Sequence, residues 1–303
     1  MLTSKKRDTV IFYLLVTVVL LPIILLRDYT PSNELRYISI ANEALNQGHI
    51  FAFTNHGVPY ADKPPLYIWL LMATKLIFGN YYHIIISLFS LIPAYVIIET
   101  MARWSRLEDK QLMAFRAMMF TCGLLIVSSL TLRMDMLMCM FIVLTLRQFF
   151  LIYNSKTPHE SWLIPIFIFL GIFTKGPIGI IIPLTSIVAF LIVKGRCIDF
   201  FKYLGWRTWG LLFVLLGLWF FAVYQEGGRD YLNNLLFNQT INRTIHSFHH
   251  SEPFYYYLYM MLPLLLPWSF FIARFVIKVY KSNKVMDNTI CLLLITTFSS
   301  IGI

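Results

Sequence analysis

The chain has 303 residues, of which 58% are hydrophobic and only 13% are charged. A soluble domain carries roughly 25% charged residues, so the composition excludes an ordinary soluble enzyme. The net charge of +10 could indicate a nucleic-acid-binding protein, but the basic residues lie in short segments between apolar runs, where membrane topology accounts for them. We therefore expect no nucleic-acid partner and a protein embedded among membrane lipids.

Apolar runs recur from one end of the chain to the other. A membrane-spanning helix needs about 17–25 such residues, and an open sheet would leave backbone groups unpaired in lipid. The predicted fold class is therefore an all-α polytopic membrane protein. The expected crossings are 10–26, 81–102, 112–131, 135–153, 161–174, 177–194, 208–225, 254–277 and 289–303.

The distribution of lysine and arginine predicts the orientation. Lys5, Lys6 and Arg7 precede the first run, which has no small-residue cleavage site after it and is interpreted as a retained span with a cytoplasmic N-terminus. The loops on the N-terminal side then carry most of the basic residues. Residues 64–79 cannot cross fully in this arrangement, and we expect them to form a juxtamembrane or re-entrant helix.

Two long loops are expected on the outer side, at 27–63 and 226–253. Within the first, "PSNELRYISIANEALNQG" predicts a helix lying in the membrane interface. Leu35, Ile38, Ala41 and Leu45 form one apolar face, and Gly48 is a suitable stop.

Unusual polar residues gather on the outer side of the predicted topology. An ionisable group within a span costs about 2.5–3.5 kcal/mol on insertion scales, so several at one depth indicate a functional site; the alternative is ordinary interfacial charge. The candidates are Asn33, Glu34, Asp62, Lys63, Arg133, Asp135, Lys175, Arg243, His246, His249, His250 and Glu252.

Two lysines stand before proline-containing helix starts. Lys63 precedes Pro64-Pro65, which favours an extended lysine next to a helix N-terminus, and Lys175 precedes Gly-Pro in "FTKGPIG". Both helix N-termini and lysine favour phosphate, and Arg243 could add a bidentate contact. Snorkelling lysines and a solvated Arg243 are the alternatives.

The acidic and imidazole groups leave several roles open. Asp62 can pair with Lys63 or bind a cation, and Asp135 can pair with Arg133. His246, His249 and His250 have helical spacing and could hold a divalent metal ion together with Asp62 or Glu252; solvated loop histidines are the alternative.

Five blocks of the sequence resemble a known family in the same order: "PSNELRYISIANEAL", "YADKPPLYIWL", "RMDMLM", "FTKGPIG" and "EPFYYYL…LPW". They are similar to the membrane glycosyltransferases that use polyprenyl-phosphate sugars, the GT-C superfamily of protein O-mannosyltransferases and aminoarabinose transferases. Among these, the lipid A 4-amino-4-deoxy-L-arabinose transferase group is most similar.

The resemblance implies a GT-C transmembrane bundle over residues 1–303, with interfacial helices in the first outer loop and a reaction chamber facing the periplasm at the inner membrane. It implies an inverting transfer from an undecaprenyl-phosphate sugar donor to a lipid A phosphate. A glycan or protein hydroxyl acceptor is one alternative, and a lipid or sugar transporter or flippase is another. The implied site residues are Asn33, Glu34 and Asp135 for catalysis, Lys63, Arg243 and Lys175 for the donor phosphate, and Asp62, His249 and His250 for a metal.

Two departures from the family pattern affect these expectations. The family usually has aspartate where this chain has Asn33, and an amide cannot act as a general base. A hydroxyl acceptor benefits from a base, whereas a phosphate acceptor is already ionised, so Asn33 favours the phosphate unless Glu34 substitutes as base. The family also has further C-terminal spans and an outer domain, which this chain is expected to lack.

Overall fold

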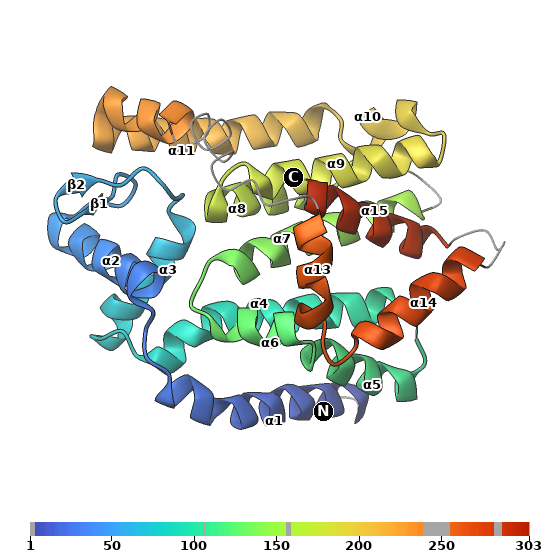
Figure 1. Cartoon of the computed structure of the whole chain (residues 1–303). Helices are drawn as coiled ribbons and strands as arrows, with labels where there is room; N and C mark the ends of the chain where they lie inside the picture. Colours follow the sequence, from blue (N-terminus) through green and yellow to red (C-terminus); the bar gives the residue numbers. More distant parts are fainter. Residues whose placement is uncertain (1–3, 106, 156–158, 239–254, 282–286, 303) are drawn as a thin grey trace.

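The computed structural model describes residues 4–105, 107–155, 159–238, 255–281 and 287–302, and its regular structure there is almost entirely helical. In Figure 1 the long helices lie side by side, and α2, α3 and a small hairpin lie together at one end of the bundle, here called the loop end. The elements are α1 (Ser4–Leu26), η1 (Pro31–Leu35), α2 (Arg36–Gln47), β1 (Thr54–Asn55), β2 (Val58–Pro59), α3 (Leu66–Phe78), α4 (His83–Trp104), α5 (Asp109–Phe120), α6 (Gly123–Leu130), α7 (Asp135–Tyr153), α8 (Leu163–Lys175), α9 (Ile178–Val193), η2 (Cys197–Asp199), α10 (Phe200–Tyr203), α11 (Trp206–Asn233), η3 (Asn234–Asn238), α13 (Tyr255–Leu264), α14 (Ser269–Lys281) and α15 (Asn288–Gly302).

Within the described residues, four helices are long and apolar enough to cross a membrane: α1, α4, α7 and α11. They correspond to the crossings predicted at 10–26, 81–102, 135–153 and 208–225. The last of these helices turns sharply at Gly228, whose φ of 73° and ψ of −175° are not helical. The helical crossing therefore ends just before Gly228, and a separate short segment follows it at the loop end.

The crossing predicted at 112–131 is a broken pair of helices. α5 and α6 meet at an angle of 64°, and the turn between α13 and α14 fills the break. Gly123 donates its N–H to the Leu266 carbonyl at 2.9 Å, and the Trp268 indole donates to the Thr121 hydroxyl at 2.9 Å. The expected single crossing at 254–277 is wrong: α13 ends at Leu264 and α14 begins at Ser269, and Pro267, which cannot supply a helical N–H, lies in the turn between them.

The other predicted crossings, at 161–174, 177–194 and 289–303, form the shorter apolar helices α8, α9 and α15. α8 and α9 form a tight antiparallel pair, because Gly179 lies against the backbone of Gly171. Close backbone approach through small residues is a common way for membrane helices to pack. α3 is also short, and it lies at the loop end beside α2 rather than along the bundle (Figure 1).

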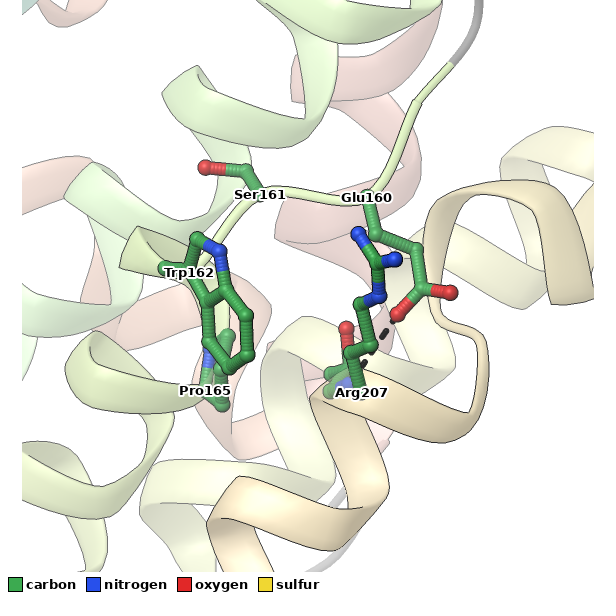
Figure 2. A pocket seen from close by; sticks show the side chains of 6 residues that line it. Glu160, Ser161, Trp162, Pro165 and Arg207 are labelled. Atoms are coloured by element: carbon green, nitrogen blue, oxygen red, sulfur yellow. Dashed lines mark hydrogen bonds between the residues drawn. The ribbon is translucent and has the colours of Figure 1, made fainter.

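The end of the bundle opposite the loop end contains the start of α11. Glu160, in the segment before α8, accepts a hydrogen bond from the Thr208 N–H at 3.1 Å, and Figure 2 shows this carboxylate beside Arg207. A carboxylate at a helix N-terminus satisfies an unpaired donor and complements the helix dipole. The carboxylate lies so close to Gly205 that a Cβ at this position would overlap it.

Candidate functional site

Glu34 joins the loop at 27–63, predicted to be the first outer loop, to the turn between α6 and α7. Its carboxylate accepts two hydrogen bonds from Arg27, at 3.0 and 2.8 Å, one from the Thr30 N–H at 2.7 Å and one from the Leu132 N–H at 2.7 Å. Only 2% of the residue is exposed. Burial alone would raise the pKa of the Glu34 carboxyl, but Arg27 and the two N–H groups outweigh it and hold the pKa below its usual value. Glu34 is therefore an ionised group that supports the loop.

Asn33 lies one residue earlier in η1. Its amide oxygen accepts a hydrogen bond from Arg36 at 3.2 Å. The Arg36 guanidinium also lies over the rings of Tyr37 and Tyr60, 5.6 and 5.9 Å from their centroids. Asn33 and Arg36 thus lie together where η1 meets α2, next to two aromatic rings.

The Asp62-Lys63 pair lies immediately before α3, whose N-cap is Pro65. The two side chains are 12% and 13% exposed, and the Lys63 Nζ is 3.6 Å from Asp62 Oδ2. The Tyr60 hydroxyl donates to the same oxygen at 3.1 Å. Burial, and then the charge of Asp62, raise the pKa of Tyr60, so this hydroxyl remains a donor. An ammonium group carries three donors, so an anion can join the contacts that Lys63 already makes.

Asp135 begins α7 and contacts two cations. Its Oδ1 pairs with the Lys175 Nζ, and its Oδ2 lies 3.4 Å from the Arg133 Nε. The predicted pair with Arg133 is therefore present, but Lys175 is the shorter contact. Lys175 closes α8 instead of opening α9, because the chain turns at Gly176 with φ of 87°. A lysine in the last turn of a helix is stabilised by the helix dipole.

Tyr37, under the Arg36 guanidinium, is in contact with Tyr67 of α3. Their rings meet edge to face, with centroids 5.9 Å apart. Burial, before any neighbouring charge, raises the pKa of Tyr37 and of Tyr67. The structure therefore brings the first outer loop, the start of α3 and the start of α7 into one polar region at the loop end.

The predicted metal site is only partly within the described part of the chain. Among the residues that the structure describes, there is no group of three histidine, cysteine, aspartate or glutamate side chains able to hold a metal ion. Asp62 lies next to the Lys63 ammonium, which competes with a metal for the carboxylate. The other proposed ligands, His249 and His250 with His246 and Glu252, lie outside the described residues, as does Arg243. The described side chains therefore do not fit a metal ion.

An apolar cavity of about 470 Å³ lies beside Asp135. It is bounded by α4, by the broken pair α5 and α6, by α7 and by the turn between α13 and α14. Asp135 is its one acidic lining residue among those described. Through Asp135 the cavity adjoins the polar region at the loop end. Its lining includes Ile97, Leu125, Met136, Cys139, Val143 and Trp268.

The roles of Arg27, Arg36, Glu226 and Tyr231 in this region were not predicted from the sequence. Arg36 stands within the block "PSNELRYISIANEAL", so that block offered a signal for it. Glu226 is an acidic residue where the apolar run of α11 ends. The hydrogen bonds of Glu226 and Tyr231 span more than 170 residues, and no local pattern predicts such contacts.

Fold and site together define a multi-pass helical membrane protein with a cationic polar region at one end of its bundle, bordered by α2 and an apolar cavity. Comparison with known proteins then gives the group that it resembles. The chain is 26% identical over 255 residues to the undecaprenyl phosphate-alpha-4-amino-4-deoxy-L-arabinose arabinosyl transferase of Shewanella sediminis, covering 81% of this chain and 46% of that protein. It is 23% identical to an uncharacterised protein of Aquifex aeolicus, over 83% of this chain and 52% of that protein. No family model matches the chain.

The solved structures agree with the sequence comparison. The crystal structure of ArnT from Cupriavidus metallidurans bound to undecaprenyl phosphate superposes with a TM-score of 0.76 at 16% identity, over 96% of this chain and 54% of that one. The apo structure gives a TM-score of 0.71 at 17% identity, over 99% and 60%. The chain thus has the fold of ArnT, and the predicted resemblance and all-α membrane fold are confirmed. It spans about half the length of the curated relatives it matches.

Proposed function

We propose that this chain forms the donor-binding part of a glycosyltransferase. In this proposal, the enzyme moves 4-amino-4-deoxy-L-arabinose from undecaprenyl phosphate to a lipid A phosphate, with inversion, at the outer face of the inner membrane. The observation that carries the proposal is the position of the Lys63 ammonium, which lies just before α3 in the polar region of a protein with the ArnT fold. A helix N-terminus and an ammonium group both attract a phosphate.

The apolar cavity supports a lipid-linked substrate. An added hydrocarbon chain gains about 0.8 kcal/mol for each buried CH₂ group, and the cavity at α4 and α7 offers apolar walls for one. Its position beside Asp135 would bring the polar head of such a lipid to the polar region. An amphiphilic phosphate suits both surfaces.

The state of the acidic groups favours a phosphate as acceptor. Asn33 is an amide and cannot accept a proton in this role. Glu34 already accepts four hydrogen bonds and is 2% exposed. Asp135 contacts two cations. An acceptor hydroxyl would need a base, whereas a lipid A phosphate is ionised and needs none.

The proposed reaction is an in-line displacement. One oxygen of the acceptor phosphate bonds to the anomeric carbon from the face opposite the donor, and the bond from that carbon to the donor phosphate breaks. The departing undecaprenyl phosphate keeps the electron pair, and Lys63, joined by Arg243 of the second outer loop, stabilises its growing charge. Asn33 and Asp135 are proposed to orient the acceptor.

Replacement of Lys63 tests this proposal. In membranes containing the full-length protein, Lys63→Ala is expected to reduce transfer of labelled aminoarabinose to lipid A by about 100-fold, the usual effect of removing one group that stabilises the developing charge. The control is Lys75→Ala, near the other end of α3, where the ammonium lies 5.4 Å from the Tyr81 ring centroid. Normal transfer by the Lys63 variant would refute the assignment.

The acceptor is tested separately by mass spectrometry of lipid A from cells with and without the gene. The proposal requires that the mass of one aminoarabinose on a lipid A phosphate disappears when the gene is deleted. If lipid A is unchanged and a protein or glycan loses a sugar instead, the acceptor is a hydroxyl and not the lipid A phosphate.

The proposed orientation can be measured with a thiol reagent that does not cross membranes. Cys197 is exposed and begins η2, next to α10 at the end opposite the loop end. Val58, 66% exposed, lies in the hairpin at the loop end. After permeabilisation of the outer membrane, Val58→Cys should react in intact cells, whereas Cys197 should react only after lysis. The reverse pattern would place the polar region in the cytoplasm.

A further inference from the structure

We infer that Glu226 and Tyr231, at the end of α11, are positioning residues that hold the first outer loop so that Lys63 faces the donor phosphate. This inference rests on the proposed function, because it assigns Lys63 to that phosphate. It concerns a contact between two outer segments that lie far apart in the sequence. We call it the α11 clasp, defined by Glu226, Gly227, Gly228 and Tyr231.

The Glu226 carboxylate binds three successive backbone N–H groups of the first outer loop. Its Oε1 accepts from Ile50 at 2.7 Å, from Phe51 at 3.1 Å and from Ala52 at 3.0 Å. Its Oε2 accepts from Phe51 as well, also at 3.1 Å. Three adjacent N–H groups pointing at one carboxylate form a nest for an anion, and charge-assisted hydrogen bonds of this kind are stronger than neutral ones. Glu226 therefore holds a segment that lies outside the helices and strands of the loop.

Two glycines make this approach possible. A Cβ on Gly227 would lie 2.8 Å from Ala52 Cβ and from Tyr231 Cβ, so a larger residue would push the loop away from α11. Gly228 has φ of 73°, a left-handed conformation that glycine adopts without strain. The turn that it makes brings Tyr231 back toward the loop.

The Tyr231 hydroxyl then joins both sides of the hairpin. It accepts the Phe53 N–H at 3.0 Å and donates to the Tyr60 carbonyl at 2.8 Å. The Tyr60 N–H in turn donates to the Phe53 carbonyl at 2.8 Å. The hydroxyl thus completes the base of the hairpin, which the two short strands alone would leave open.

The clasp connects to the candidate site through Tyr60. Its backbone is held by Tyr231, and its hydroxyl donates to Asp62, which contacts Lys63. Trp69 of α3 adds a second link, since its indole donates to the Ile50 carbonyl at 2.6 Å. A shift of the clasped segment would therefore move the Asp62-Lys63 pair relative to α3. A misplacement of about 1 Å can reduce activity by about 100-fold.

The test measures binding of radiolabelled undecaprenyl phosphate to the purified full-length protein in detergent. Glu226→Ala and Tyr231→Phe are each expected to weaken binding by about tenfold, part of the loss expected for a misplaced group. In a Lys63→Ala background, Glu226→Ala should add no further loss, because two residues that act through one contact are not additive. Hydrogen exchange at residues 50–53 should accelerate in both clasp variants.

The matched control is Glu43→Ala. Glu43 also accepts backbone N–H groups of the first outer loop, from His56 and Gly57 at 2.8 Å each, but it belongs to that loop and does not link it to α11. It should leave binding within about twofold of the parent protein, as expected for a site that is not coupled to Lys63. Size-exclusion chromatography checks that each variant is folded. Tyr231→Phe removes only one oxygen and is therefore the clasp variant that disturbs packing least.

The outcomes separate the inference from the proposed function. If the parent protein binds undecaprenyl phosphate through Lys63 but both clasp variants bind it equally well despite faster exchange, the inference is overturned and the function stands. The inference is overturned in the same way if Glu226→Ala weakens binding equally with and without Lys63. If Lys63→Ala leaves binding unchanged, the proposed function and the inference that rests on it both fall.

Discussion

The Glu34 carboxylate accepts the Leu132 N–H at 2.7 Å and the Arg27 guanidinium at 2.8 Å. One buried side chain thus ties the end of α1 and the turn before α7 to the interfacial helix. With 2% of the residue exposed, little of the carboxylate is left for a substrate to reach. The motif that suggested a catalytic acid in the sequence contains, in the structure, an acid that supports the outer loop.

Glu34→Ala is expected to destabilise the protein by about 3 kcal/mol, because it leaves a partly buried arginine and two N–H groups without their acceptor. Thermal unfolding in detergent measures the change. Asn33→Ala, which removes a single hydrogen bond to Arg36, should cost about 1 kcal/mol or less. A Glu34 variant with an unchanged unfolding midpoint and no transfer activity would instead identify Glu34 as a catalytic base.

The same group predicts a pH dependence. The pKa of Glu34 in the folded protein lies below its ordinary value of 4.5. The folded state therefore binds fewer protons than the unfolded state near that pH, and the contribution of the carboxylate is complete above 4.5 and is lost as the pH falls through the lower folded pKa. Unfolding midpoints of the parent protein and of Glu34→Gln should converge as the pH falls below the ordinary value. A constant difference down to low pH would contradict this.

Lys175 is expected to contribute less to donor binding than Lys63. The Lys175 ammonium donates a hydrogen bond to Asp135, which neutralises its charge, whereas the Lys63 Nζ is 3.6 Å from the Asp62 carboxylate. Lys175→Ala should change the affinity for undecaprenyl phosphate by about threefold or less. Because the pair with Asp135 is partly exposed, the loss of stability should be about 1 kcal/mol or less. Equal loss of binding in the Lys63 and Lys175 variants would show that both lysines hold the phosphate.

Gly179→Ala is expected to prevent the tight packing of α8 against α9. The added Cβ would overlap the backbone of Gly171 and Ile172, and backbone cannot rotate away as a side chain can. We expect a destabilisation of about 2 kcal/mol, in the range known for overpacked sites. Gly217→Ala in α11 is the control, since its Cβ would meet no atom within 4 Å. Equal unfolding midpoints for the two variants would contradict the close approach.

Much of the fold was predictable because membrane helices are limited by local composition. The crossings at α1, α4, α7 and α11 follow from apolar length alone. The break between α5 and α6 did not follow, because the residues around Thr121 and Cys122 are compatible with a continuous helix. It depends on the backbone and indole of Leu266 and Trp268, more than 140 residues away.

The sequence predicted which residues gather at the candidate site better than it predicted which acid pairs with which base. Asp62, Lys63, Asp135 and Lys175 were expected on one side, and the structure places them just before α3, at the start of α7 and at the end of α8. Which acid meets which base depends on helix ends: the turn at Gly176 makes Lys175 the end of α8 instead of the start of α9. A one-residue shift in such a turn would change its partner.

Composition and short motifs were enough to establish a helical membrane protein that resembles the aminoarabinose transferases, because apolar run lengths and ordered motifs are local properties of the chain. Three contacts became visible only in the folded protein: the hydrogen bonds of Arg27 to the buried Glu34, the pairing of Asp135 with Lys175, and the hydrogen bonds of Glu226 with the first outer loop. The last two of these contacts join residues distant in sequence. A charged group in a low-dielectric environment is stabilised by whichever partners the packing brings to it.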